Sequence, residues 1–187
     1  MVARTDDFNG GRAAKLVYHL PSMIRTTSSN VDSQAIWRPD VTVASIVPRD
    51  GKFLLVEEIV RGELVLNQPA GHLEPDESLP AAARRETLEE TGWEIELTAL
   101  VGVYQWTNPG GDGHFLRFAF AATPLRHNPQ RPLDAGIVRA LWLARDEIAA
   151  EHARLRSPMV LRCVDDWLSG QRMPLNAMVC LLAEAGM

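Results

Sequence analysis

Cysteine is scarce in this chain of 187 residues, which contains only Cys163 and Cys180. The two form no CxxC pair and have no histidine at the spacing of metal ligands, so the sequence offers neither a zinc ribbon nor a disulfide framework. We therefore predict that both are small buried hydrophobic residues, in a protein of the reducing cytoplasm.

Long hydrophobic runs and an excess of basic residues are absent as well. No run of about 18 apolar residues occurs, so we expect no membrane span, and the N-terminus lacks the charged-then-apolar layout of a signal peptide. The formal net charge of −5 argues against a nucleic-acid polymer or an anionic lipid surface as a partner. An acidic protein that binds a small phosphorylated molecule needs local cations, either a metal ion or arginine, at its site.

The composition is otherwise that of a globular protein, with 46% hydrophobic and 23% charged residues, and the chain is long enough for one domain with a sizeable core. Residues 1–38 differ because they are rich in Gly, Ser, Thr and Asn, and we predict a disordered or loosely attached arm there. The alternative is a start codon placed too far upstream. We place one domain at residues 39–175 and a tail or short helix at residues 176–187.

Alternating and β-branched apolar residues predict strands on both sides of one central helix. The expected strands are Val41–Val47, Lys52–Glu57, Leu64–Leu66, Glu94–Tyr104, Phe115–Ala121 and Arg139–Leu143. We expect the first two to pair as a hairpin through Asp50–Gly51, and Thr123–Gly136 to be a loop. Further helices are expected over Arg145–Glu151 and from Pro158 to about Leu168. This order predicts an α+β fold with α/β/α layering.

The most informative stretch is Gly71–Trp93, with the sequence GHLEPDESLPAAARRETLEETGW. Its capping residues predict a short helix within Ser78–Gly92. On this helix Glu86, Glu89 and Glu90 stand at i, i+3 and i+4, so they share one face, where like charges repel. A hard divalent cation such as Mg²⁺ or Mn²⁺ would remove the repulsion, although an isolated acidic triplet of this kind is usually a solvated face.

The same stretch resembles the Nudix box, the sequence signature of the Nudix hydrolase family. All charged residues and glycines of the box are matched, by Gly71, Glu77, Arg85-Glu86, Glu89-Glu90 and Gly92. The one departure is Thr87, where the family usually has an aliphatic residue. The similarity extends over residues 39–175, where segments such as Asn67–Glu74, Phe115–Phe118 and Leu155–Pro158 look like the bacterial NudJ-type phosphatases of this family.

The resemblance implies the Nudix α/β/α sandwich around a mixed sheet, and a Mg²⁺-dependent hydrolase of diphosphate bonds. For the NudJ-type subgroup it implies action on nucleoside di- and triphosphates and on hydroxymethylpyrimidine diphosphate. Two alternatives stay open. One is a Nudix pyrophosphatase for ADP-ribose, dinucleoside polyphosphates or oxidised nucleotides; the other is a non-catalytic module that senses a nucleotide. The intact glutamates favour an enzyme, but the box holds metal and phosphates and does not select the substrate.

The predicted metal ligands are the carboxylates of one helix face and a backbone carbonyl, from Glu86, Glu89, Glu90 and Gly71. The predicted catalytic residues are Glu89, Glu86 and Arg85. The base that takes a proton from water is either Glu89 or an acid on a distant loop, for which Asp134 and Asp112 are the candidates. Arg85 is expected to pair with Glu77 and to hold the helix against the preceding loop.

Substrate contacts are predicted at His72, Tyr104, Trp106 and Arg117. A histidine after the glycine of the box can touch a phosphate, the two aromatic residues can stack on a base, and Arg117 can meet a phosphate. Each has a structural alternative: an exposed loop histidine, core packing of the aromatic rings, and an arginine that faces solvent or an acidic neighbour. Arg156 precedes a helix start, and a structural ion pair is the preferred interpretation there.

Overall fold

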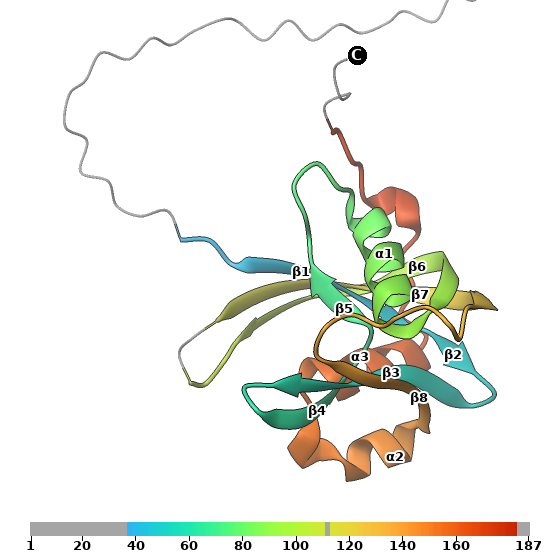
Figure 1. Ribbon diagram of the computed structural model, residues 1–187. Helices are drawn as coiled ribbons and strands as arrows, with labels where there is room; N and C mark the ends of the chain where they lie inside the picture. The colour runs from blue at the N-terminus through green and yellow to red at the C-terminus, as the bar shows by residue number, and fades with distance from the viewer. Residues whose placement is uncertain (1–36, 111–112, 183–187) are drawn as a thin grey trace, which may run out of the picture. The chain divides into compact units, whose positions relative to one another are not determined.

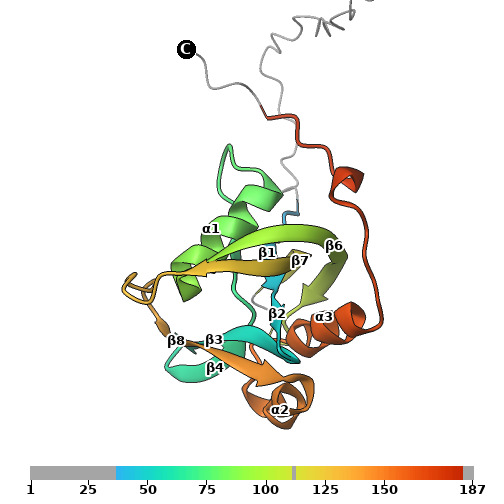
Figure 2. The same ribbon diagram turned by 90° about the vertical axis from the view of Figure 1, so that its right-hand side faces the viewer.

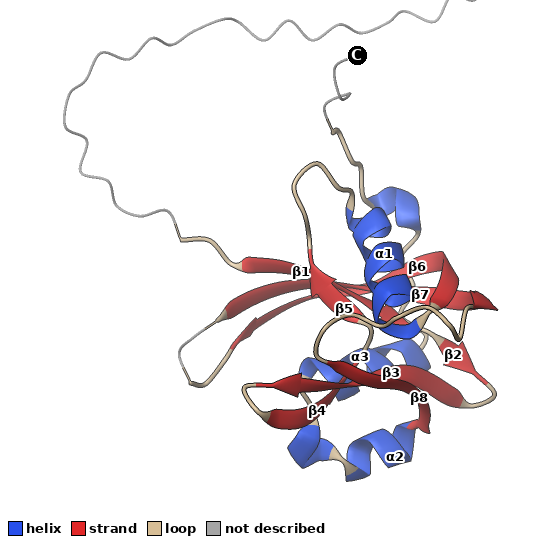
Figure 3. Cartoon of the chain, in the orientation of Figure 1, coloured by secondary structure: helices blue, strands red, loops and turns tan. Residues whose placement is uncertain are grey.

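The computed structural model describes residues 37–110 and 113–182, and its elements form two β-sheets and three α-helices. Figure 1 shows their order along the chain, and Figure 3 shows the strands and helices by type. Apart from residues 37 and 38, the arm predicted at residues 1–38 lies outside the described residues.

The first sheet is mixed, with four strands in the order β5 (Ala70–His72), β1 (Asp40–Ile46), β7 (His114–His127) and β6 (Trp93–Thr107). β1 runs parallel to β7 and antiparallel to β5, while β6 and β7 form a long antiparallel pair. In this register Val43 lies opposite Gly71, and Thr42 lies opposite Arg117. Strand β1 therefore brings the glycine of the box close to residues much further along the chain.

The second sheet is antiparallel and centred on β3 (Lys52–Val60), which pairs with β2 (Pro48–Arg49), β4 (Glu63–Asn67) and β8 (Ile137–Ala144). The predicted hairpin between the first two strands is wrong in its pairing. Only β2 pairs with β3, because the chain passes from the first sheet to the second at Val47, whose carbonyl accepts a hydrogen bond from the N–H of Leu54 at 3.0 Å. Val43 and Ile46 are buried, as suits an interior strand with a neighbour on each side.

The helices are α1 (Leu79–Thr91), α2 (Arg145–Ala150) and α3 (Met159–Leu168). Figure 2 shows α1 and α3 on opposite sides of the first sheet. Ala82 of α1 packs in one buried cluster with Phe120 of β7, while Cys163 of α3 packs in the other with Ala121. Adjacent strand residues point to opposite faces, so the first sheet is the middle layer between two cores. The α/β/α layering predicted for an α+β fold is confirmed.

Helix α1 has the predicted ends because both are fixed by local interactions. Ser78 Oγ accepts a hydrogen bond from the N–H of Ala81 at 3.2 Å, and Gly92 takes the left-handed conformation, with φ of 70°. Thr87 is fully buried on this helix, where its hydroxyl lies 2.8 Å from Ser45 Oγ. The polar residue at this position of the box is therefore satisfied, and its contact ties the helix to β1.

Two expectations about the later part of the chain need correction. β7 continues to His127, so the predicted loop over Thr123–Gly136 is a strand in its first part, because Trp93 at the start of β6 pairs with His127. Cys163 is buried, and burial raises the pKa of its thiol to about 11. Cys180 is exposed, contrary to the prediction, since residues 178–182 form neither helix nor strand.

In the described part of the chain, no helix is long and apolar enough to cross a membrane.

Candidate active site

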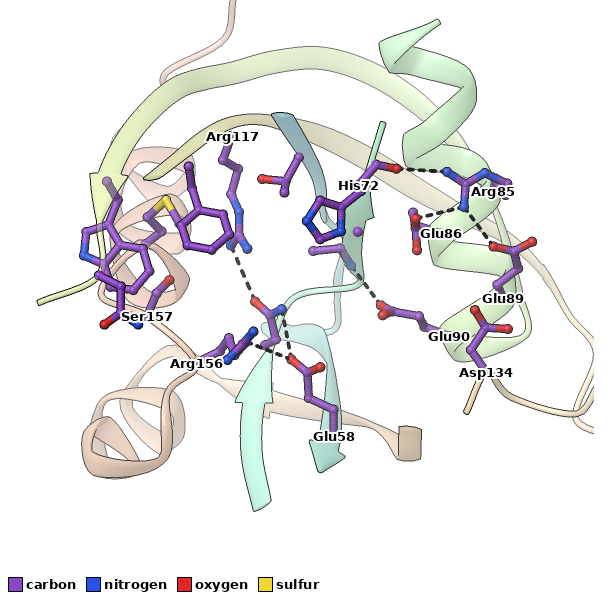
Figure 4. A pocket seen from close by; sticks show the side chains of 18 of the residues that line it. Glu58, His72, Arg85, Glu86, Glu89, Glu90, Arg117, Asp134, Arg156 and Ser157 are labelled. Atoms are coloured by element: carbon purple, nitrogen blue, oxygen red, sulfur yellow. Dashed lines mark hydrogen bonds and ion pairs between the residues drawn. The ribbon is translucent and has the colours of Figure 1, made fainter. Parts of the chain in front are cut away.

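A cavity of about 690 Å³ lies where the first sheet meets α1, the end of β4 and the segment before α3 (Figure 4). We call one part of it the acidic end, formed by Glu86, Glu89, Glu90 and Asp134. We call the other part the donor end, formed by Thr42, Arg117 and Ser157. Figure 4 shows His72 between the two ends.

Glu90 is a deeply buried carboxylate at the acidic end. It is 8% exposed, and its Oε2 accepts one hydrogen bond, at 2.8 Å, from the N–H of Ala70. Burial is the main reason that the pKa of Glu90 is raised to about 8, and the negative charges of Glu86, Glu58 and Asp134 contribute in the same direction. The ionised form of this carboxylate is therefore poorly stabilised by its surroundings.

Gly71 lies directly against the carboxylate of Glu86. A Cβ on Gly71 would stand 2.2 Å from Glu86 Oε1, so no larger residue fits unless Glu86 moves. Burial raises the pKa of Glu86, as it does for Glu90. The glycine of the box thus sets the place of a predicted metal ligand through close approach.

Arg85 connects the glutamates of the helix to the preceding loop. Its Nε and Nη2 each lie 2.9 Å from a carboxylate oxygen of Glu77, which confirms the predicted pair. Its Nη1 donates to Glu86 at 2.8 Å and to Glu89 at 3.0 Å, while Nη2 also donates to the carbonyl of His72 at 3.1 Å. One guanidinium therefore holds the loop and two predicted ligands at once.

The acidic end fits a hard divalent cation by its chemistry. Its donors are all oxygen, Glu90 has a single hydrogen bond among the described residues, and the carboxylates raise one another's pKa through repulsion. No three acidic, histidine or cysteine side chains among the described residues are already gathered around one point. Arg85 Nη1 instead bridges Glu86 and Glu89, at 2.8 and 3.0 Å.

Of the two distant acids predicted as bases, the structure brings Asp134 to the cavity. Its backbone N–H donates to the carbonyl of Glu89 at 3.2 Å, which fixes the loop after β7 against the end of the helix. Asp112 lies outside the described residues. Glu58 of β3 also lines the cavity, where its Oε1 accepts from Asn67 Nδ2 at 3.2 Å.

Three of the four predicted substrate residues line the cavity, namely His72, Trp106 and Arg117. Tyr104 does not, because its hydroxyl donates to Asp166 of α3 at 3.0 Å and its ring packs against the core between sheet and helix. Core packing, the structural alternative for Tyr104, is what the structure shows.

Arg117 is buried in the donor end, with 6% of its surface exposed. It faces neither solvent nor a carboxylate: its Nη1 donates to Asn67 Oδ1 at 3.5 Å and to Gln68 Oε1 at 3.4 Å, both neutral oxygens. Burial lowers the pKa of Arg117 from its usual value. Its neighbour Arg156 instead has the predicted ion pair, with Nε 3.8 Å from Glu58 Oε1.

A model of the NUDIX domain matches residues 37–163, most of the chain and all of the cavity. The chain belongs to the Nudix hydrolase family. It is 43% identical to Phosphatase NudJ of Escherichia coli K12 over an alignment of 141 residues. That alignment covers 75% of this chain and 91% of that protein. It is 47% identical to a solved NUDIX hydrolase from Nitrosomonas europaea, with a TM-score of 0.75, covering 76% of this chain and 97% of that one.

A crystal structure of a UDP-X diphosphatase shares the fold alone, with 20% identity, a TM-score of 0.60, and 76% and 69% of the two chains covered. The resemblance seen in the sequence is thus confirmed. This Nudix hydrolase acts on acid anhydrides, as its family does.

Sequence reasoning missed several residues of this Nudix site. They are Thr42, Glu58, Asn67, Phe115, Ser157 and Met159. They come from four strands, the segment before α3 and the start of α3, and only the pairing of β1 with β7 and the course of the chain after β8 bring them together. The one signal in the sequence was the Asn-Gln-Pro segment before the box, whose amide oxygens turn out to face Arg117.

Proposed function

We propose that this Nudix hydrolase cleaves diphosphate bonds of nucleoside di- and triphosphates, and of hydroxymethylpyrimidine diphosphate, with Mg²⁺ or Mn²⁺ as its cofactor. The observation that carries the proposal is the acidic end of the cavity, where the buried Glu90 has no cationic partner among the described residues and Glu86 and Glu89 share one guanidinium, that of Arg85. The 43% identity to Phosphatase NudJ supports a phosphatase over the other Nudix activities.

Glu86, Glu89 and Glu90 hold the cation in this proposal, with the carbonyl of Gly71 as a further ligand. When bound, a divalent cation neutralises phosphate oxygens and lowers the pKa of water. Arg85 is a positioning residue that keeps the glutamates in place through its bidentate pair with Glu77. The walls of the cavity orient the diphosphate and exclude bulk water from it.

The proton of the attacking water goes to Glu89 or to Asp134. Both line the cavity at the same end, and a hydrogen bond from Asp134 N–H to the carbonyl of Glu89 joins their segments. Either carboxylate, once protonated, returns its proton to solvent or to the leaving phosphate oxygen. The reaction adds water across the phosphoanhydride bond, so one phosphate and one shortened phosphate ester leave the site.

The test is phosphate release from a panel of compounds, with and without Mg²⁺. The panel holds nucleoside di- and triphosphates, hydroxymethylpyrimidine diphosphate, ADP-ribose and a dinucleoside polyphosphate. Metal-dependent release of inorganic phosphate from the simple di- and triphosphates is expected. Cleavage of ADP-ribose or the dinucleoside compound alone would overturn the substrate class, and nucleotide binding without any turnover would replace the enzyme by a sensor.

A further inference from the structure

The donor end of the cavity contains an unusual concentration of unpartnered polar atoms. Among the described residues, four buried side-chain atoms have no hydrogen-bond partner, and three of them belong to residues that line this one cavity: Thr42 Oγ1, Arg117 Nε and Ser157 Oγ. These residues are 5%, 6% and 6% exposed. Buried polar groups are normally hydrogen-bonded, because an unsatisfied one destabilises the fold. Three at one place indicate that a ligand completes them.

Arg117 adds a buried charge to this set. No carboxylate of the described residues stands within 4.0 Å of its guanidinium, and its hydrogen-bond partners among them are amide oxygens at 3.4 and 3.5 Å. Those amides are themselves fixed, since Asn67 Nδ2 donates to Glu58 and Gln68 Nε2 donates to the carbonyl of Val160. The guanidinium is therefore held rigidly in place while its Nε–H stays available.

The surroundings of Arg117 indicate what kind of group it meets. Trp106 and Phe115 line the cavity and pair with each other two residues along the strands from Arg117; their rings stack, with centroids 5.5 Å apart and planes at 23°. Met159 lines it as well, at the start of α3. A few fixed polar groups beside aromatic side chains suit a flat ring better than a phosphate, which would need more charged donors: the second arginine near them, Arg156, is paired with Glu58.

The position of the donor end matches this assignment. Figure 4 shows Arg117 and Ser157 on one side of His72, and Glu86, Glu89 and Glu90 on the other. A substrate whose diphosphate lies against the glutamates therefore extends its organic part toward Arg117. The Nε–H of Arg117 is a donor only, and both hydroxyls can also donate, so the complementary ring edge carries acceptors.

We propose that the donor end binds the acceptor edge of a planar heterocycle, that is, a ring carbonyl oxygen or an unprotonated ring nitrogen, through Arg117, Thr42 and Ser157. The ring is the organic part of the substrate, and to that extent the inference rests on the proposed function. Ring binding itself needs neither metal nor turnover, so the two can fail separately.

The test is calorimetric titration of the metal-free protein with cytidine, whose ring edge carries a carbonyl oxygen beside a bare nitrogen. Ribose is the ring-free control. We expect cytidine to bind and ribose not to bind, and we expect Arg117→Met to weaken cytidine at least about tenfold, as loss of a charged hydrogen bond does. Arg126→Met is the matched control on the same strand, because Arg126 is exposed and pairs with Glu94 outside the cavity. This variant should bind cytidine with the affinity of wild type.

Thr42→Val keeps the proposal falsifiable if Arg117→Met does not fold. The change keeps the shape and removes a hydroxyl that has no hydrogen-bond partner in residues 37–110 and 113–182. Cytidine affinity should fall a few-fold while the unfolding temperature is unchanged or higher, whereas a structural role for the hydroxyl would lower that temperature.

Two results would overturn the proposal. One is a protein that does not bind cytidine, or binds it equally after Arg117→Met and Thr42→Val. The other is a site for anions: inorganic pyrophosphate, titrated into the metal-free protein, would bind and would lose affinity with Arg117→Met as much as cytidine does. Failure of the proposed hydrolysis looks different, because cytidine would bind normally to a protein that turns over no diphosphate.

Discussion

Glu57 of β3 and Arg117 of β7 are buried to nearly the same degree, with 5% and 6% of their surface exposed, but only one of the two charges is compensated. Glu57 accepts from Arg139 Nε and from Arg154 Nη2, both at 2.5 Å. The partners of Arg117 among the described residues are neutral amide oxygens. The fold thus provides opposite charge for a buried group where it serves structure alone.

Glu90 belongs with Arg117 in this comparison. It is 8% exposed and has one backbone N–H as its partner in the described part of the chain, although two other carboxylates of the helix lie on the same face. A buried ionisable group without a counter-charge either destabilises the fold or loses its charge, so such groups are found where a ligand supplies what the protein leaves out. By this argument we expect the acidic end of the cavity to bind a cation and the donor end to bind a substrate ring.

The largest effect is expected from Glu90→Gln. The change removes a charge that we assign to the cation while it keeps the size of the side chain. Turnover should be abolished, a loss of more than about 1,000-fold, because the phosphate oxygens would no longer be neutralised. Phosphate release measures this, and a normal circular dichroism spectrum is the control. Activity within about tenfold of wild type would remove Glu90 from the metal site.

Glu89→Gln and Asp134→Asn separate the two candidate bases. The residue that takes the proton should lose about 100-fold or more in kcat with little change in KM, whereas the other should lose much less. The pH profile of kcat distinguishes a base from a ligand, since loss of the base removes the acidic limb. Equal small losses in both variants would place the base elsewhere in the cavity.

Gly71→Ala should cost about 10- to 100-fold in turnover. Its new Cβ would stand 2.2 Å from the carboxylate of Glu86, so this side chain must move from its place beside Arg85. Gly62→Ala is a matched control for glycine removal, since nothing lies within 4 Å of a Cβ there, although its φ of +88° adds strain. Full activity of Gly71→Ala would show that turnover does not depend on the position of the Glu86 carboxylate.

Glu57→Gln should have the smallest effect, confined to stability. The hydrogen bonds from Arg139, and then from Arg154, lower the pKa of Glu57 below 4.5. A carboxylate with a lowered pKa stabilises the fold at any pH above its pKa in the unfolded chain, which is about 4.5. This stabilisation is lost as the pH falls through its pKa in the folded protein. The unfolding temperature should drop by about 2–4 °C at pH 7, because both arginines are partly solvated, and the difference from wild type should shrink below pH 4. A difference that did not change with pH would rule out the ion pair as its cause.

The acidic end could be predicted from the sequence because its information is local. Glu86, Glu89 and Glu90 share a face through helix periodicity alone, and the helix that carries them is bounded by Ser78 and Gly92, whose capping contacts reach only a few residues. The pair of Arg85 with Glu77 spans eight residues and follows from the same segment.

Of the donor end only Arg117 was predicted, because the residues of this end meet only through tertiary pairing. Thr42 and Arg117 become neighbours when β1 pairs in parallel with β7, and the sequence favoured a hairpin for β1 instead. Ser157 arrives from the segment before α3. Tyr104 and Trp106 are both aromatic residues two positions apart, so the sequence could not show that they have different roles. Only the fold shows that the hydroxyl of Tyr104 is hydrogen-bonded to Asp166.

The most direct test is thermal unfolding of wild type, Glu57→Gln and Glu90→Gln, each without metal and with Mg²⁺. A cation that binds the folded state raises the unfolding temperature. Mg²⁺ should raise it for wild type and for Glu57→Gln but not for Glu90→Gln, and in the metal-free protein only Glu57→Gln should be less stable than wild type. An equal rise in Glu90→Gln, or a metal-free loss as large as that of Glu57→Gln, would contradict the account, because Glu90 would then be a structural residue and not a ligand.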